Sequence, residues 1–583
     1  MNFHSEQKHF FSKYKILIMV VVTTLFTLLV LHPNIKAKWG AIDDHESMLF
    51  LATKAELTST QIISEWGKEE IKKFGNSKRV RPFYYLLREL ETHLWQFNVE
   101  GWYLTRIFFC VLVMFTIWYI FSNYVGLFTA LLFTLLTTNE RFWADLWTRL
   151  GPSESYAAAG LAVWSLVFYK ILLRLKTGTA PALWMYLIFF LSSLVVIGAK
   201  ENMVFMAGFV FFLEIKLILS NLNNNKFEHK FEPKVVNKAV NKIGHILNIS
   251  VLIFTAMMML SIILAMGKYQ ADIYGTSVET ASRLNSLIRG FFRLKIVHIS
   301  FYLSTILFIL SHAHFNFRYN FLNKLSSLTK EIRLLWYAEF VMVAIYAFQF
   351  AFYNRNWPPS MRYDFPIQLT IFLSLFFFYL FILKFLSQYD SSRKYKRNFI
   401  LIFNLGIIIY LLARNLMGLS YVDIHKNAVR NQQRTNTLME KIMEIKNLTS
   451  LNSENSLKPI ILISHNPWNA EFLISITRFF KAYKITNPLS VSVAFNKNKN
   501  KNYGFWGSNN NDESDKSSNS LIEKIAEDIF SWSLKGGEGF IALEESFQRA
   551  KNKNILPYCV GIGKKNEGKH SSSECQDIGV LKW

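Results

Sequence analysis

The run ILIMVVVTTLFTLLVL occupies residues 16–31 and contains no charged side chain. A helix of this length approaches what is needed to cross about 30 Å of hydrocarbon. A secretory signal peptide has a shorter apolar region followed by a small-residue cleavage site, and the segment LHPNIKAKW that follows offers only a weak one. We therefore predict that the run is a retained membrane anchor.

Similar apolar runs recur along the 583 residues, of which 51% are hydrophobic and 18% are charged. A soluble protein carries roughly a quarter charged residues, and a membrane β-barrel shows alternating segments of about ten residues instead. The chain is predicted to be a polytopic α-helical membrane protein with about eleven transmembrane helices. The predicted spans are 16–31, 104–121, 124–138, 155–172, 183–198, 203–219, 248–266, 297–312, 335–352, 366–386 and 399–416.

The formal net charge is +24, which in a soluble protein would suggest a nucleic-acid partner. Here every second predicted loop is basic, the pattern of loops on the cytoplasmic side of a membrane. We therefore predict no nucleic-acid partner, a cytoplasmic N-terminus and a C-terminus on the opposite side. Examples of the basic loop residues are Lys170, Arg174, Lys176, Arg393, Lys394, Lys396 and Arg397.

The composition changes near residue 424. Residues 1–423 are predicted to form the membrane domain, with a first outer loop at about 32–103. Residues 424–583 are predicted to form a small extracytoplasmic α/β domain, in which the Asn/Lys/Ser-rich segment 496–519 is a disordered loop.

Within that domain, IHKNAVRNQQRTNTLMEKIMEIKNL has the spacing of an amphipathic helix. PIILISH and ILPYCVGIG are predicted strands, and NPWNAEFLISITRFFKAY and LIEKIAEDIFSWSL are predicted helices. The three cysteines show no metal-binding spacing, and Cys559 can pair with Cys575 if the domain lies outside the cytosol.

Acidic residues gather just past the first span. The stretch WGAIDDHESMLFL, residues 39–51, contains Asp43, Asp44 and Glu46. A polar flank at a membrane exit is one explanation. Apolar residues on both sides would partly desolvate these carboxyls, which raises a carboxyl pKa and suits proton transfer. We therefore predict that this acidic cluster belongs to a catalytic site.

Four further segments on the predicted outer side carry ionisable residues: GNSKRVRPFYYLLRELETHLWQF (75–97), ERFWADLWTRLGPSE (140–154), GAKEN (198–202) and YNRNWPPSMRYD (353–364). Pro82 is expected to open a helix. Arginines near a lipid surface suit phosphate recognition, and Lys or Glu this close to hydrocarbon is a functional candidate. Attraction to lipid headgroups, an aromatic belt, snorkelling and structural salt bridges are the alternatives.

In this order, the segments DDHE, KRVRPFYYLL, RFWADLWTRLGPSE and GAKEN resemble the GT-C superfamily of membrane glycosyltransferases, in the group related to protein O-mannosyltransferases and aminoarabinose transferases. The resemblance covers roughly residues 10–220. It implies a glycosyltransferase of a bacterial inner membrane that moves a sugar from a polyprenyl-phosphate donor to a lipid, glycan or protein acceptor on the extracytoplasmic face.

The resemblance also implies residue roles. Asp43 or Asp44 would be the general base, with Asp44 preferred, and Glu46 would support it. Basic groups would hold the lipid phosphate and acids would support them; the candidates are Arg81, Arg141, Arg149, Lys200, Arg355 and Arg362, with Asp145, Glu154 and Glu201.

Some relatives bind a divalent metal through acids of the second outer loop. In this chain Glu140 and Asp145 are five positions apart rather than adjacent or alternate. They are weak metal candidates, and no cofactor is predicted.

Two other functions remain open from the sequence. A transporter or flippase of a lipid-linked saccharide would place ionisable residues in mid-span and often shows broken helices, whereas the apolar runs here are mostly uncharged at their centres. A scaffold whose tail binds a partner would leave the acidic cluster replaceable. We also predict that the tail after Leu419 is dispensable for membrane insertion but shapes the choice of acceptor.

Overall fold

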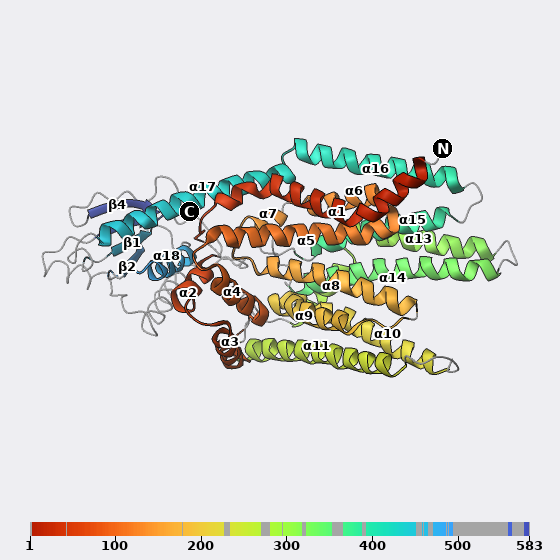
Figure 1. Ribbon diagram of the computed structural model, residues 1–583, viewed down its shortest axis with the longest axis horizontal. Helices are drawn as coiled ribbons and strands as arrows, with labels where there is room; N and C mark the ends of the chain where they lie inside the picture. The colour runs from red at the N-terminus through yellow and green to blue at the C-terminus, as the bar shows by residue number, and fades with distance from the viewer. Residues whose placement is uncertain are drawn as a thin grey trace.

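The computed structural model describes residues 3–41, 44–77, 79–140, 142–177, 179–226, 234–269, 280–293, 295–316, 322–352, 365, 367–387, 392–450, 458, 460–464, 470–485, 487, 489–493, 558–562 and 576–581. Long helices form a bundle whose members run in nearly the same direction (Figure 1). Each predicted apolar run overlaps one of them, so the chain is a polytopic helical protein. The bundle helices are α1 (Phe3–Leu31), α5 (Val99–Val125), α6 (Leu127–Thr138), α8 (Ser153–Lys176), α9 (Leu183–Ala199), α10 (Ala207–Lys226), α11 (Lys234–Tyr269), α13 (Ile296–Asn316), α14 (Leu322–Phe352), α15 (Ile367–Leu386) and α16 (Ser392–Leu416).

The length and composition of the helices support fewer membrane spans than the eleven predicted. Among the described residues, seven helices are long and apolar enough to cross a membrane, or eight if α12 (Thr280–Phe291) and α13, bent by 55°, form one broken span. Helix α6 has 12 residues and α9 has 17. At 1.5 Å per residue these helices are roughly 18 and 25 Å long, short of the 30 Å of a typical hydrocarbon core.

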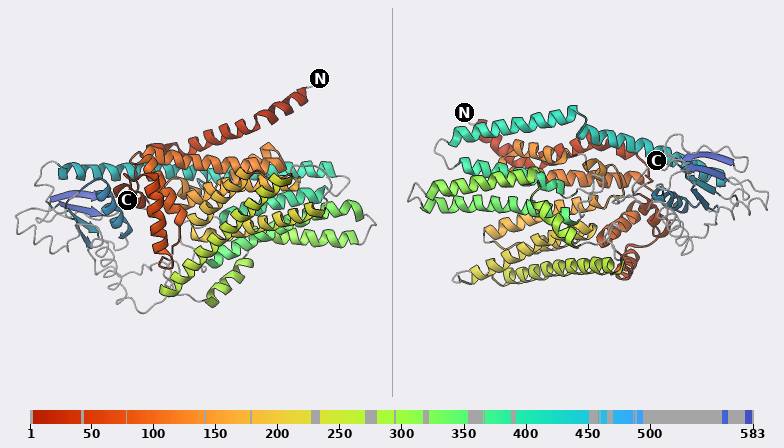
Figure 2. Two further views of the ribbon diagram at one scale, coloured as in Figure 1. Left: turned by 60° about the horizontal axis from the view of Figure 1, so that its bottom comes forward. Right: turned by 180° about the vertical axis from the view of Figure 1, so that it is seen from behind.

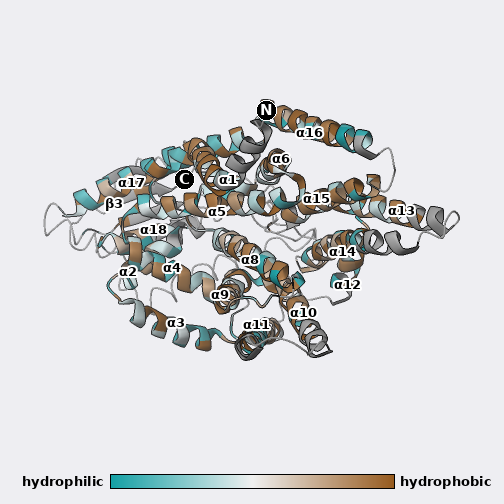
Figure 3. Cartoon of the chain, turned by 45° about the vertical axis from the view of Figure 1, so that its right-hand side comes forward, coloured by the Kyte–Doolittle hydropathy of each residue, from teal (hydrophilic) through white to brown (hydrophobic). Residues whose placement is uncertain are grey.

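Hydrophobic residues are frequent along the bundle helices, while hydrophilic residues are frequent on α3 (Ser59–Lys73) and α17 (Tyr421–Ser450) (Figure 3). Large apolar side chains on several helices face outward, among them Leu25, Phe108, Ile263 and Leu401, each more than half exposed. Outward apolar side chains along helices of this length are typical of contact with lipid.

The C-terminal part contains a four-stranded parallel sheet with the strand order β2-β1-β3-β4. The strands are β1 (Ile460–Ser464), β2 (Leu489–Val493), β3 (Tyr558–Ile562) and β4 (Gln576–Leu581), and α18 (Ala470–Ala482) connects β1 to β2. Strands β1 and β3 lie within PIILISH and ILPYCVGIG, and α17 covers the predicted amphipathic helix. The predicted helix at 521–534, the loop at 496–519 and Cys575 lie outside the described residues.

Short elements gather at the end of the bundle that lies beside the sheet (Figures 1 and 2). They are the 3₁₀ helices η1 (His32–Lys36) and η2 (Glu201–Met206) and the helices α2 (His45–Thr53), α3, α4 (Pro82–Trp95) and α7 (Phe142–Trp147). The start of α1 lies at the opposite end (Figure 1). The predicted outer segments that the structure describes therefore meet at one end of the bundle.

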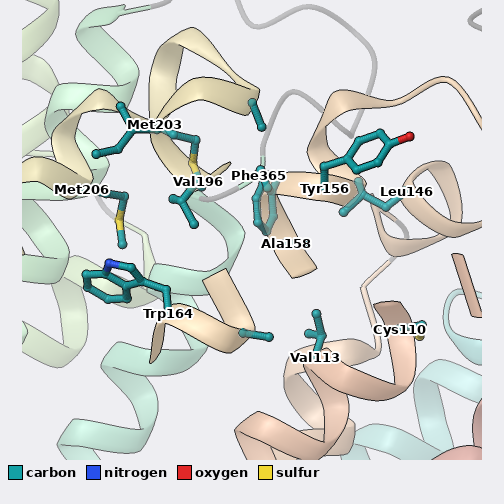
Figure 4. Close-up of a cluster of buried hydrophobic side chains, with 14 of the residues drawn as sticks. Cys110, Val113, Leu146, Tyr156, Ala158, Trp164, Val196, Met203, Met206 and Phe365 are labelled. Atoms are coloured by element: carbon teal, nitrogen blue, oxygen red, sulfur yellow. The ribbon is translucent and has the colours of Figure 1, made fainter. Parts of the chain in front are cut away.

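A cluster of buried hydrophobic side chains packs between the helices and loops at this end (Figure 4). Leu146 of α7, Tyr156 of α8, Met203 of η2 and Phe365 are all buried in one cluster. Because these side chains come from four separate segments, their packing holds the loops before α8 and after α9 in place.

Candidate active site

Helix α4 carries the largest share of the buried polar groups at this end. Pro82 is its first residue, where the ring fixes a helical φ and no N–H is needed. The predicted helix start is therefore confirmed. Tyr84, Arg88, Glu89 and Glu91 of α4 are all buried, although three of them are ionisable charges. Buried charges need partners, and those partners define the site.

Asp44 joins the first loop to the loop before α8. The side chain is 2% exposed. Its Oδ2 accepts a hydrogen bond from the Gly40 N–H at 2.8 Å, and its Oδ1 accepts from the Leu150 N–H at 3.1 Å and the Gly151 N–H at 2.9 Å. A carboxylate has about four acceptor positions, so backbone donors occupy most of them. This environment favours an anchoring role over the predicted role of Asp44 as the base.

Glu46 lies in the first turn of α2 and is half-buried. Its Oε2 accepts a hydrogen bond from the Tyr84 hydroxyl, which also lies 2.9 Å from the carbonyl oxygen of Gly151. Burial, reinforced by the nearby charge of Glu46, raises the pKa of Tyr84 well above its ordinary value. Tyr84 therefore stays protonated and donates. Asp44 accepts from the N–H of Gly151, and the Tyr84 hydroxyl lies beside the C=O of the same residue.

Glu91 is the centre of a buried ionic cluster. Its Oε2 accepts from Arg106 Nη2 at 2.7 Å and from the Tyr156 hydroxyl. Arg106 Nη2 also lies 3.3 Å from the carbonyl oxygen of Leu150. Arg106 is a fully buried cation within a bundle helix, and a carboxylate partner offsets much of the cost of burying it.

Arg88 lies beside this cluster with its Nη1 4.0 Å from Glu91 Oε2. Within the part of the chain that is described, no nitrogen of its guanidinium makes a hydrogen bond. The group instead lies over the rings of Tyr84, Trp102 and Tyr156, 5.5–5.8 Å from their centroids. Cation–π contacts stabilise a desolvated guanidinium by about 2 kcal/mol.

Two ion pairs lie where α8 begins and α9 ends. Lys200 Nζ is 2.6 Å from Glu154 Oε1, and Arg81 Nε is 2.8 Å from Glu201 Oε2. Arg81 Nη1 is also 3.5 Å from the Ser153 hydroxyl. These residues come from three separate segments of the chain, and the structure brings two predicted phosphate-binding cations together with two predicted supporting acids.

The two cations respond differently to burial. Burial lowers the pKa of Lys200, and the charge of Glu154 opposes this shift without cancelling it. Burial also acts to lower the pKa of Arg81, but the charge and hydrogen bond of Glu201 outweigh it and the pKa is raised. Arg81 is therefore a permanent cation, whereas the charge of Lys200 depends on pH.

The remaining predicted residues divide into two groups. Asp43, Arg141, Arg355 and Arg362 lie outside the described residues. Asp145 in α7 and Arg149 in the loop before α8 are half-buried and belong to the segment that Asp44 anchors.

Glu140, one of the two weak metal candidates, is engaged by another group. Its Oε2 is 3.2 Å from Arg414 Nη2 of α16, and burial raises its pKa despite that arginine. In the described ranges no group of three or more His, Cys, Asp and Glu side chains is arranged to hold a metal ion. The residues around Glu140 do not fit a metal site, so no reaction step is assigned to a metal.

Several buried ionic residues were missed from the sequence. The main ones are Glu91 with Arg106, and Lys54, whose Nζ is 2.7 Å from Glu89 Oε1. One signal was present: Arg106 is a cation inside the predicted span 104–121, and intramembrane charges are functional candidates by default.

Helices α17 and α18 of the C-terminal part form hydrogen bonds with the first loop. In α17, Thr435 Oγ1 accepts from the Lys38 N–H at 2.9 Å, and Asn431 Nδ2 donates to the Tyr103 hydroxyl at 2.9 Å. In α18, the Ser475 hydroxyl donates to the carbonyl oxygen of Ala41. The segment that leads into the acidic cluster is thus bonded to both helices.

Comparisons with known proteins give no family assignment. No protein-family model matches the chain. A search of curated proteins also finds no match.

Proposed function

We propose that this protein is an integral-membrane glycosyltransferase of the GT-C type, which moves a sugar from a polyprenyl-phosphate donor to an acceptor hydroxyl. One observation carries the proposal: at a single end of an apolar bundle, Asp44 of the acidic first loop binds the loop before α8, and two cations, the buried Lys200 and the half-buried Arg81, contact the residues that follow that loop. A reaction between a lipid-linked phosphate and a hydroxyl needs a base and cations in such a place.

The reaction is a displacement at the anomeric carbon. A carboxylate of the first loop removes the acceptor hydroxyl proton, the oxygen attacks the anomeric carbon, and the bond from that carbon to the phosphate oxygen breaks. The polyprenyl phosphate leaves with the bonding electrons, and nearby cations stabilise its charge. Backbone N–H groups occupy most of the acceptor positions of the Asp44 carboxylate. The base is therefore Glu46 or Asp43.

The orientation and domain division are also part of the proposal. The site end and the sheet would face the extracytoplasmic side of a bacterial inner membrane, with the N-terminus cytoplasmic. The start of α1 and the strand β4 lie at opposite ends of the molecule (Figure 1), which supports this arrangement. The elements after residue 423, including the parallel sheet, would form the extracytoplasmic α/β domain.

The test is transfer of radiolabelled sugar from polyprenyl-phosphate donors in proteoliposomes. We expect Glu46→Gln or Asp43→Asn to reduce transfer about 10²–10⁴-fold, the usual contribution of a general base. The matched control is Glu56→Gln, which neutralises an exposed acid just beyond α2 and should leave the rate unchanged. Wild-type-like transfer by both variants and their double mutant would contradict the proposed base.

Lys200 gives a second prediction. Because its pKa lies below the ordinary 10.5, phosphate binding that needs its charge should weaken as the pH rises through that lowered pKa. Glu154→Gln removes the charge that opposes the shift, so the alkaline loss should move to lower pH. Lys200→Arg keeps a cation at all accessible pH values and should abolish the loss. Polyprenyl-phosphate affinity measured from pH 7 to 10.5 checks this, and three identical profiles would refute it.

A transporter or flippase of a lipid-linked saccharide remains the second candidate because of one observation. Glu339 is fully buried within α14, with Ser374 Oγ of α15 donating to its Oε2 at 2.5 Å. Buried acids inside membrane helices often belong to transport pathways. If the wild type shows no transfer but moves labelled lipid-linked saccharide across proteoliposomes, and Glu339→Gln stops this, the second function holds instead.

A further inference from the structure

Helix α18 of the C-terminal part docks on α2, the helix that begins at the acidic cluster. Ile476, Phe479 and Phe480 of α18 share one buried cluster with Met48 and Leu51 of α2. The Ser475 hydroxyl donates to the Ala41 carbonyl just before α2. The two helices lie side by side in Figures 1 and 2. Docking through a shared core fixes which face of α18 is turned toward the site.

Arg478 lies on that face. It is three residues after Ser475, and residues three apart lie on the same side of a helix. Its Nε and Nη1 are buried and, among the described residues, have no hydrogen-bond partner. Glu46 is close enough for its charge to act on it. A cation of the C-terminal helix therefore faces the candidate base.

Within the part of the chain that the structure describes, Nε and Nη1 of Arg478 have hydrogen-bonding capacity that is not used. A guanidinium has five N–H donors, and a buried donor without a partner costs about 1–3 kcal/mol. Glu46, the carboxylate whose charge acts on Arg478, already accepts from Tyr84. Burial lowers the pKa of Arg478, and the charge of Glu46 offsets this only in part. A second anion beside Arg478 would stabilise the charge of the guanidinium and accept hydrogen bonds from its Nε and Nη1.

We infer that Arg478 forms an anion subsite, and that the acceptor carries an acidic group, a phosphate or a carboxylate, close to the hydroxyl that receives the sugar. The inference rests on the proposed function. In the proposed function the donor phosphate has its own cations, Arg81 and Lys200, which pair with acids where α8 begins and α9 ends. Arg478 belongs to α18, which lies beside the sheet (Figure 1). An acidic group bound there would lie beside the acceptor hydroxyl, from which Glu46 would remove the proton.

The probe is glycerol 3-phosphate, a water-soluble phosphate ester with free hydroxyls, titrated into the full-length protein in lipid nanodiscs. Arg478→Gln should weaken its binding about tenfold or more, since a charge-assisted hydrogen bond is lost. Arg478→Lys, which keeps a point charge without the planar fork, should fall in between. The matched control is Lys481→Gln, which removes an exposed cation from the last turn of the same helix and should bind as the wild type does.

Further titrations distinguish an anion of the acceptor from the phosphate of the donor. Uncharged glycerol should not bind, and binding of polyprenyl phosphate should change less than threefold in Arg478→Gln. Equal glycerol 3-phosphate binding by wild type and Arg478→Gln, or none by the wild type, overturns the subsite. A loss confined to polyprenyl phosphate overturns its assignment to the acceptor. These titrations need no sugar transfer, so failure of the proposed function would appear separately, as inactive wild type with intact binding.

Discussion

Glu91→Gln is expected to lower the free energy of unfolding by about 3–5 kcal/mol, the usual cost of leaving a buried charge unpaired. The carboxylate of Glu91 accepts from Arg106 at 2.7 Å and lies 4.0 Å from Arg88, and both guanidiniums are fully buried. A neutral amide also turns an NH₂ group toward these donors or gives up one acceptor oxygen. The change is best measured by thermal unfolding of the detergent-solubilised protein.

The control for Glu91→Gln is Glu100→Gln. Glu100 is an acid in the first turn of α5, the helix that carries Arg106, and it is exposed. An exposed substitution of this kind should change stability by no more than about 0.5 kcal/mol. If Glu91→Gln unfolds at the same temperature as Glu100→Gln, the ionic cluster does not hold α4 against α5.

Asp44→Asn is expected to cost about 3 kcal/mol of stability and to abolish sugar transfer as well. The carboxylate accepts from three backbone N–H groups, and hydrogen bonds to a charged group are worth about 1.5–3 kcal/mol each. An amide has only one acceptor oxygen, and its NH₂ would face a backbone N–H. The loop at Gly151 would then separate from the first loop, and Tyr84 would lose its fixed position beside Glu46.

Measuring both properties of Asp44→Asn separates the anchor from the base. An anchor predicts that thermal stability and transfer fall together, whereas a base predicts a lost rate with unchanged stability. Glu46→Gln serves as the comparison, because its side chain is half-buried and makes one hydrogen bond to Tyr84. A stable, folded and inactive Asp44→Asn protein would restore Asp44 as the base predicted from the sequence.

Local patterns in the sequence predicted the elements well. The apolar runs predicted the helices of the bundle, because burial in lipid requires consecutive apolar residues. Pro82 predicted the start of α4, because its ring suits only the first turn of a helix. Alternating basic loops predicted that the acidic segments meet at one end. Each of these signals lies within a few neighbouring residues, so no tertiary contact is needed to read it.

The sequence could not predict the features of the site that depend on distant contacts. The sequence favours Asp44 as the base, but two of the three backbone N–H groups that it binds, those of Leu150 and Gly151, lie more than a hundred residues away in the chain. Arg478 was not considered, because only the docking of α18 on α2 brings it to the acidic cluster. Removing everything after Leu419 would also delete Thr435 and Ser475, so that truncation alone cannot separate acceptor choice from the integrity of the first loop.

By itself the sequence determined that this is a membrane protein of long apolar helices, and it predicted that the loops with clustered acids gather at one end, since hydropathy and charge act locally. Only the tertiary structure decided which of those ionisable residues anchor a loop, which form ion pairs and which have hydrogen-bond donors that no described residue accepts from. The physical reason is that a carboxylate or guanidinium owes its role to burial and to partners at about 3 Å, and those partners come from segments that meet only in the folded chain.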